Sequence, residues 1–167
     1  MAELIYSIYI YPKITLMDFA FDITIKNRMI FKSFLEHFTL EELNKVPEGF
    51  SNNIFWNIAH TVVTQQLLVY SLSELPMLVS KELVLKYKKG TKTEHVATQN
   101  EVDEIKGLLF STIEQTQKDY NAKLFKHYNT YTVSTKSTLT NVDDAITFNN
   151  FHEGIHLGYI LALKKSL

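Results

Sequence analysis

Two histidines and a glutamate near the end of the sequence are the residues best suited to chemistry. His152, Glu153 and His156 spell H-E-x-x-H within the segment NNFHEGIHLGYI. On a helix, residues four apart differ by only about 40° in direction and lie one turn apart, so both imidazoles can face one ion. The same spelling is the signature of zinc metallopeptidases, in which the glutamate acts as the general base. The pattern predicts a metal site and raises a peptidase as the first hypothesis.

The peptidase hypothesis needs a third ligand, and the sequence does not supply it downstream. A catalytic zinc site usually takes three protein ligands and leaves one position for water. The eleven residues after His156 contain no His, Asp or Glu. Tyr159 and Ala162 occupy the positions where the metzincin extension needs Gly and His. The third ligand must therefore come from upstream.

His60 is the best upstream candidate for that ligand. It lies in NIFWNIAHTVV, among apolar residues of a predicted helix. A lone histidine in such a place is more often a packed core residue than a ligand. Beside an H-x-x-x-H pair the ligand role is favoured, because facing helices of a bundle assemble metal sites. We assign His37, His95 and His127 to the surface, with His127 also placed to line the mouth of a pocket.

Four segments with a 3.6-residue hydrophobic period predict the helices that would position these residues. They are expected from about residue 17 to 38, from 51 or 52 to 74, from 98 to 122 and from 140 or 141 to about 165. Thr39 with Glu42, and Thr98 with Glu101, are predicted capping boxes. The apolar face expected for the first helix comprises Phe19, Ile23, Ile30, Phe31, Phe34, Leu35 and Phe38.

The stretch HYNTYTVSTKSTLTN has no helical period and is rich in Thr and Ser, which indicates an extended connection. We therefore predict an all-α fold, a four-helix bundle with a long extended crossover before the last helix. The lysine-rich segment KYKKGTKTEH is interpreted as a solvated loop rather than an anion site.

Composition limits the possible functions. The 167 residues suffice for one domain, and the 46% apolar and 13% aromatic content is globular. A formal net charge of −1 argues against a nucleic-acid partner, which normally selects a basic surface. The absence of cysteine excludes disulfides, thiolate metal ligands and a cysteine nucleophile. It also fits a cytoplasmic location, and no stretch suggests a membrane partner.

The N-terminal segment MAELIYSIYIYP has two interpretations. It lacks a basic start and a small-residue cleavage site, so it is a poor signal peptide, and it is too short to span a bilayer. Its β-branched and aromatic residues favour a strand. Alternatively, residues 1–16 are an extension upstream of a true start at Met17. We assign the domain to residues 17–167 and leave 1–16 as an N-terminal extension.

Two motifs together resemble a known family. The segments FWNIAH and FHEGIHLGYILAL, in that order on the second and fourth predicted helices, resemble the DinB-like family of metal-binding four-helix bundles. The resemblance covers residues 17–167 and implies that His60, His152 and His156 are the metal ligands. Gly158 matches the glycine two places after the last ligand. Tyr159 stands where the family often has Gln, so a shared polar role at that position is open.

Three neutral imidazoles favour Zn²⁺ or Ni²⁺ among the divalent transition metals. Characterised relatives include transferases and isomerases that use low-molecular-weight thiols, so the resemblance implies a thiol cosubstrate. We expect a metal-dependent thiol S-transferase acting on a small electrophile, and a homodimer. A metal-dependent hydrolase and a non-catalytic metal-binding or dimerising module are the alternatives. Candidates to orient a ligand imidazole or line the pocket are Asn57, Asn149, Glu153 and Tyr159.

Overall fold

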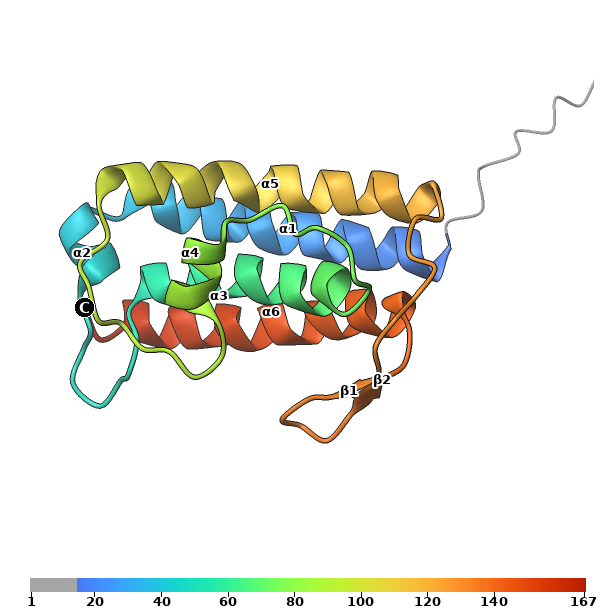
Figure 1. Cartoon of the computed structure of the whole chain (residues 1–167). Helices are drawn as coiled ribbons and strands as arrows, with labels where there is room; N and C mark the ends of the chain where they lie inside the picture. The colour runs from blue at the N-terminus through green and yellow to red at the C-terminus, as the bar shows by residue number, and fades with distance from the viewer. Residues whose placement is uncertain (1–14) are drawn as a thin grey trace, which may run out of the picture.

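The computed structural model describes residues 15–167 (Figure 1). The strand expected for the N-terminal segment lies outside these residues. The fold is all-α, as predicted, apart from one small antiparallel hairpin of two strands. The elements in chain order are α1 (Leu16–His37), α2 (Leu40–Asn44), α3 (Ile54–Gln66), the π-helix η1 (Leu67–Ser71), α4 (Lys81–Tyr87), α5 (Gln99–Asn121), β1 (Tyr131–Thr132), β2 (Thr138–Leu139) and α6 (Val142–Lys164).

Side-chain caps fix where the helices begin. The two predicted capping boxes, at Thr39 and Thr98, are confirmed. The predicted start of the second long helix at Ser51 or Asn52 was wrong. Its N-cap is Asn53, whose side-chain oxygen accepts a hydrogen bond from the Trp56 amide at 2.7 Å. The side chain of Asn52 instead accepts a bond from the backbone of Thr93, which ties the loop before α5 to the start of α3.

The inner face of α1 differs from the predicted one. Phe31, Phe34 and Leu35 are buried as expected, but Phe19 and Ile30 are exposed. The buried stripe instead continues through the polar residues Thr24 and Arg28. The hydrophobic period alone does not predict these two positions, because polar side chains are buried only where they have hydrogen-bond partners in the core.

The four long helices lie side by side (Figure 1). Helices α1 and α3 each pack against both α5 and α6, so α5 and α6 occupy opposite corners. After η1 the chain returns along the length of the molecule, through α4, to the start of α5. Residues 122–141 then cross from α5 to α6 at one end of the molecule and carry the β1–β2 hairpin. This crossover places α6 directly beside α3.

A group of buried polar side chains joins α1, α5 and α6. Arg28 of α1 donates from Nε and Nη2 to Oε1 of Glu153 on α6, at 3.1 and 3.0 Å. Its Nη1 donates to Leu109 O and Thr112 Oγ1 of α5, at 2.8 and 2.7 Å. Asn149 Nδ2 donates to the same Glu153 oxygen at 2.9 Å. Arg28 and Glu153 are both fully buried, and their bonds together join α1, α5 and α6.

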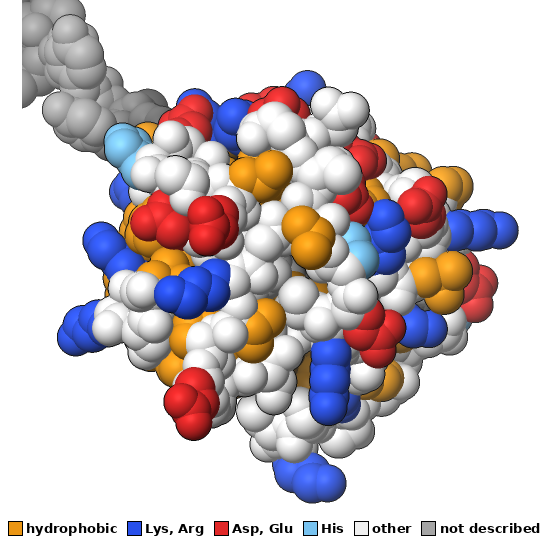
Figure 2. Space-filling model, turned by 90° about the vertical axis from the view of Figure 1, so that its left-hand side faces the viewer, with side chains coloured by type: hydrophobic (Ala, Val, Ile, Leu, Met, Phe, Trp, Pro, Cys, Tyr) orange, Lys and Arg blue, Asp and Glu red, His pale blue; other side chains and the backbone are white. Residues whose placement is uncertain are grey.

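The surface carries charges of both signs. At the end formed by α2 and the C-terminus, acidic and basic side chains are interspersed with hydrophobic ones (Figure 2). This face shows no extended basic area of the kind that binds phosphates. Within residues 15–167, none of the helices combines the length and the hydropathy needed to cross a bilayer.

The ion pair generates a stability prediction. Glu153→Leu leaves the Arg28 guanidinium buried without its counter-charge, so we expect the free energy of unfolding to fall by about 3–5 kcal/mol in urea denaturation. The double variant Arg28→Leu/Glu153→Leu should lose less, because no uncompensated charge remains. The control is Asp22→Asn, which breaks the exposed Asp22–Lys26 pair and should cost less than about 1 kcal/mol. If the Glu153→Leu protein is as stable as this control, the buried Arg28–Glu153 pair does not have the stabilising role described.

Candidate metal centre

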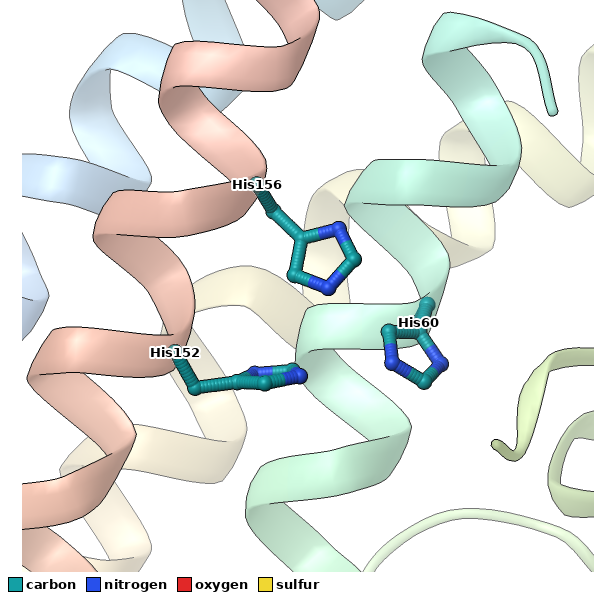
Figure 3. A group of neighbouring side chains, drawn as sticks. All are labelled: His60, His152 and His156. Carbon is teal, nitrogen blue, oxygen red and sulfur yellow. The ribbon is translucent and has the colours of Figure 1, made fainter. Parts of the chain in front are cut away.

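Three imidazoles meet between α3 and α6. His60 comes from α3, and His152 and His156 come from successive turns of α6. Figure 3 shows the three rings pointing toward one another across the space between the two helices. Each offers a ring nitrogen, and the three nitrogens lie within 4.8 Å of one another. The structure thus brings together the three histidines that the sequence singled out, and the cluster can hold a metal ion.

A hydrogen bond fixes the tautomer of His60. Its Nδ1 lies 2.6 Å from the carbonyl oxygen of Tyr87, the last residue of α4. A carbonyl oxygen only accepts, so Nδ1 carries the proton and Nε2 is the unprotonated nitrogen. Trp56 stacks on the other side of the ring, with 4.6 Å between ring centroids. The ring is therefore held from two sides before any ion arrives.

His156 is held in the same way, by a side chain. Its Nδ1 lies 2.8 Å from Oδ1 of Asn57 on α3. The Asn57 amide donates from Nδ2 to the carbonyl oxygen of Asn53 at 2.7 Å, and this bond determines which end is oxygen. Nδ1 of His156 must therefore donate, which again leaves Nε2 unprotonated. Metal-binding histidines commonly donate their second nitrogen to such an acceptor.

His152 has no comparable support in residues 15–167. Its Nδ1 is buried and lacks a hydrogen-bond partner there. Asn149, the expected partner three residues earlier, donates to Glu153 instead. A buried polar atom without a partner costs free energy, and an ion bound at Nδ1 itself would be one way to offset that cost.

Burial keeps the three imidazoles neutral. Burial, with a smaller contribution from the neighbouring histidines, lowers the pKa of His152 to about 2 and that of His156 to about 3. Burial also lowers the pKa of His60, although the bond to Tyr87 opposes the shift. Metal ions bind the neutral form of imidazole, so the site is in its binding form at neutral pH. A set of three neutral nitrogen ligands fits a divalent transition ion.

A cavity of about 480 Å³ opens beside the histidines. It lies between α3 with η1, α6 and the β1–β2 hairpin, with one residue from the loop after α4. Half of its lining side chains are hydrophobic or aromatic, and the other half are polar. The lining consists of His60, Thr64, Leu67, Leu68, Ser71, Leu72, Lys89, Tyr131, Val133, Ser134, Phe148, His152, Ile155 and His156.

Other sequence candidates lie elsewhere. Glu153 points to Arg28 and does not line the cavity. Tyr159 is also absent from the lining; its ring packs edge-on against Phe50, with centroids 5.4 Å apart. His95 contacts Tyr87 and Glu101, and His127 contacts Asn129. Glu153 and Tyr159 therefore point away from the cluster on other faces of α6, and the loop residues His95 and His127 have other partners.

Two residues of the cavity escaped the sequence analysis. The hydroxyl of Thr64 lies 3.3 Å from His60 Nε2. Its position one helical turn after His60 was the available signal. Lys89 was assigned to a solvated loop; it is indeed exposed, but it also borders the cavity. Nothing local in KYKKGTKTEH distinguishes it from the neighbouring lysines.

Sequence comparison gives one family match. The model of the DinB superfamily matches residues 24–160, which contain all three histidines. None of the curated proteins gives a significant match to the chain. The family is metal-binding, in agreement with the histidine cluster.

We expect the purified protein to carry about one divalent transition ion, and His60→Ala and His152→Ala each to remove most of its affinity. Metal analysis and titration of the single tryptophan, Trp56, provide the measurement, since its ring stacks on His60. His127→Ala, which changes an exposed histidine, is the control. Normal affinity in the His60→Ala protein contradicts a site made of three histidines.

Substitutions of the two buried asparagines, Asn57 and Asn149, should have different effects on metal affinity. Asn57→Ala removes the acceptor that orients His156, so metal affinity should fall about 10- to 100-fold. Asn149→Ala removes a donor to Glu153 and should lower stability while leaving metal affinity within about threefold, because it contacts no ligand. Calorimetric metal titration and urea denaturation of both variants provide the test. Equal affinities in the two variants mean that Asn57 has no orienting role.

Stability should depend on pH in a defined direction. The pKa values of the folded imidazoles lie below that of ordinary histidine, so below about pH 6.5 the unfolded chain binds more protons. The free energy of unfolding of the metal-free protein should therefore fall on acidification, by at most about 1.4 kcal/mol per pH unit for each histidine. Urea denaturation at about pH 7 and about pH 5 measures it, and the comparison with His152→Phe separates the histidines from carboxylates such as Glu153, whose pKa is raised by burial. His152→Phe should flatten the dependence, and His127→Ala should not.

Proposed function

The chain belongs to the DinB superfamily, and from this premise we propose that it is a metal-dependent S-transferase that joins a low-molecular-weight thiol to a small electrophile. The observation that supports this most is the convergence of three neutral imidazoles at the wall of a partly apolar cavity. Two of them have their Nδ1 protons held by fixed acceptors, so their lone pairs are available. Zn²⁺ or Ni²⁺ suits this ligand set best.

A divalent ion bound there would lower the pKa of a thiol and so favour the thiolate, which is the nucleophile. In the reaction the S–H bond of the thiol breaks and an S–C bond to the electrophile forms. The leaving group departs with its electron pair, and the thiol proton passes to solvent. The chain's own contributions are the three histidines, the Thr64 hydroxyl, which can donate a hydrogen bond to sulfur, and apolar walls that exclude water.

The position of Glu153 favours transfer over hydrolysis. A hydrolase of the H-E-x-x-H type uses this carboxylate to take a proton from water. Here the carboxylate is bound to Arg28, and the cavity lining in the described part of the chain includes no Asp or Glu. Thiol transfer needs no such base. The cavity beside the cluster also favours an enzyme over a purely structural metal module.

The proposal includes the assembly state and location expected from the sequence. We assign the four long helices to the four-helix bundle of this family. A homodimer is supported by apolar side chains left exposed on α1 and α6, among them Phe19, Phe151 and Leu161. A cytoplasmic location follows from the cysteine-free composition and belongs to the same proposal.

Cobalt substitution tests the thiol chemistry. Adding a small thiol to the Co²⁺-loaded protein should produce a sulfur-to-cobalt charge-transfer band, and the thiol should then react with 1-chloro-2,4-dinitrobenzene faster than in buffer. Glu153→Gln should retain this response under conditions in which the variant is folded, and His152→Ala should lose it. An absorption spectrum that does not change when thiol is added contradicts the proposal. Metal-dependent peptide cleavage that disappears in Glu153→Gln would instead establish a hydrolase.

A further inference from the structure

The apolar walls of the cavity and the lysine at its edge indicate which kind of electrophile it can bind. Resting on the proposed function, we propose that the electrophile is an amphiphilic carboxylate: an apolar body that fills the cavity, with one anionic group paired with Lys89.

One wall is the π-helix η1. The regular α-helix that presents His60 changes to π geometry over Leu67–Ser71, and three of its residues, Leu67, Leu68 and Ser71, face the cavity together with Leu72. π-Helical turns occur often at functional sites because the wider turn shifts side chains that α geometry would place elsewhere. Here the shifted side chains are mainly leucines. This wall offers a ligand mainly apolar contacts and one hydroxyl group, that of Ser71.

The opposite wall is the β1–β2 hairpin, which contributes Tyr131, Val133 and Ser134. Its position is fixed by two bonds from the preceding segment to η1 and the residue after it. Tyr128 Oη donates to Leu68 O at 3.1 Å, and Asn129 N donates to Leu72 O at 2.7 Å. Val133 is also buried in the core cluster at this end. The cavity is therefore preformed, at about 480 Å³, within the range of small-molecule sites.

Lys89 supplies the charge. Apart from the three neutral histidines, it is the one ionisable cationic side chain among the lining residues that the structure describes. In residues 15–167 its ammonium group makes no ion pair, whereas nearby Lys86 is paired with Glu82 and Glu101. Among the lining residues of the described chain, no carboxylate is present to neutralise it. A free ammonium beside an apolar cavity suits an anionic group on the ligand.

The same turn of chain places Lys89 and His60. Tyr87, two residues earlier, accepts the hydrogen bond that holds His60, and its ring is buried. The end of α4 therefore sets the distance between the anion-binding lysine and the metal cluster. An electrophile anchored at Lys89 extends along apolar walls toward the histidines. A polar thiol would gain little from those walls, so we assign the carboxylate to the electrophile.

Ligand binding to the full chain tests this inference. The probe is 4-phenylbutyrate, compared with 4-phenylbutanol and 4-phenylbutylamine, by calorimetry on chelator-treated protein so that the carboxylate cannot bind an ion. Lys89→Met should weaken phenylbutyrate binding about tenfold or more, the loss of a charge-assisted bond. Lys88→Met, the same change at a neighbouring lysine outside the cavity, should change it less than about twofold, and Lys89→Arg should restore it. The alcohol and the amine should bind about tenfold more weakly than the acid.

Three results overturn the inference: no phenylbutyrate binding, equal loss in Lys89→Met and Lys88→Met, or amine binding as tight as that of the acid. N-acetylcysteine, a polar thiol with a carboxylate, is the further arm. If its binding depends on Lys89 and that of phenylbutyrate does not, the lysine serves the thiol and the inference is wrong. Because no metal or thiol takes part in the phenylbutyrate arm, its failure is distinct from failure of the transferase. Lys89-dependent binding without a thiol response refutes only the transferase.

Discussion

The buried ion pair between Arg28 and Glu153 is the constraint on which the site depends. Its charges are stable in the core only while α1, α5 and α6 keep the positions that let Arg28 reach all of its partners. Glu153 and His152 are adjacent on α6, so their side chains diverge by about 100°. Turning Glu153 toward α1 and α5 therefore turns His152, and with it His156, toward α3. The orientation of the histidine cluster is therefore linked to a contact on an adjacent face of the same helix.

On the α3 side, hydrogen bonds from backbone and cap residues set the chemistry. Asn53 caps α3 and also orients the amide of Asn57, which in turn orients His156. The carbonyl at the end of α4 performs the same task for His60. Both acceptors are fixed before a metal binds, so little reorganisation is needed for binding. The start of α3 and the end of α4 thus determine which nitrogen of His60 and of His156 is unprotonated.

Much of this was accessible from the sequence, because it depends on local rules. Helix periods, the capping boxes at Thr39 and Thr98, and the four-residue spacing of His152 and His156 are all short-range patterns. The partner of Glu153 was not accessible, since Arg28 lies 125 residues away and no motif relates them. The same applies to Lys89, whose proximity to the cavity depends on how α4 packs. The π-helix also gave no signal, because its sequence retains an ordinary apolar pattern.

Anomalous diffraction from zinc-loaded crystals tests the central claim most directly, since it locates the ion without reference to activity. One strong peak is expected at about 2.0–2.1 Å from Nε2 of His60, Nε2 of His156 and one ring nitrogen of His152, at the edge of the cavity. Arg28 and Glu153 should keep their mutual bonds and stay clear of the ion. A peak coordinated by Glu153, or the absence of any peak among the three imidazoles, would contradict the account.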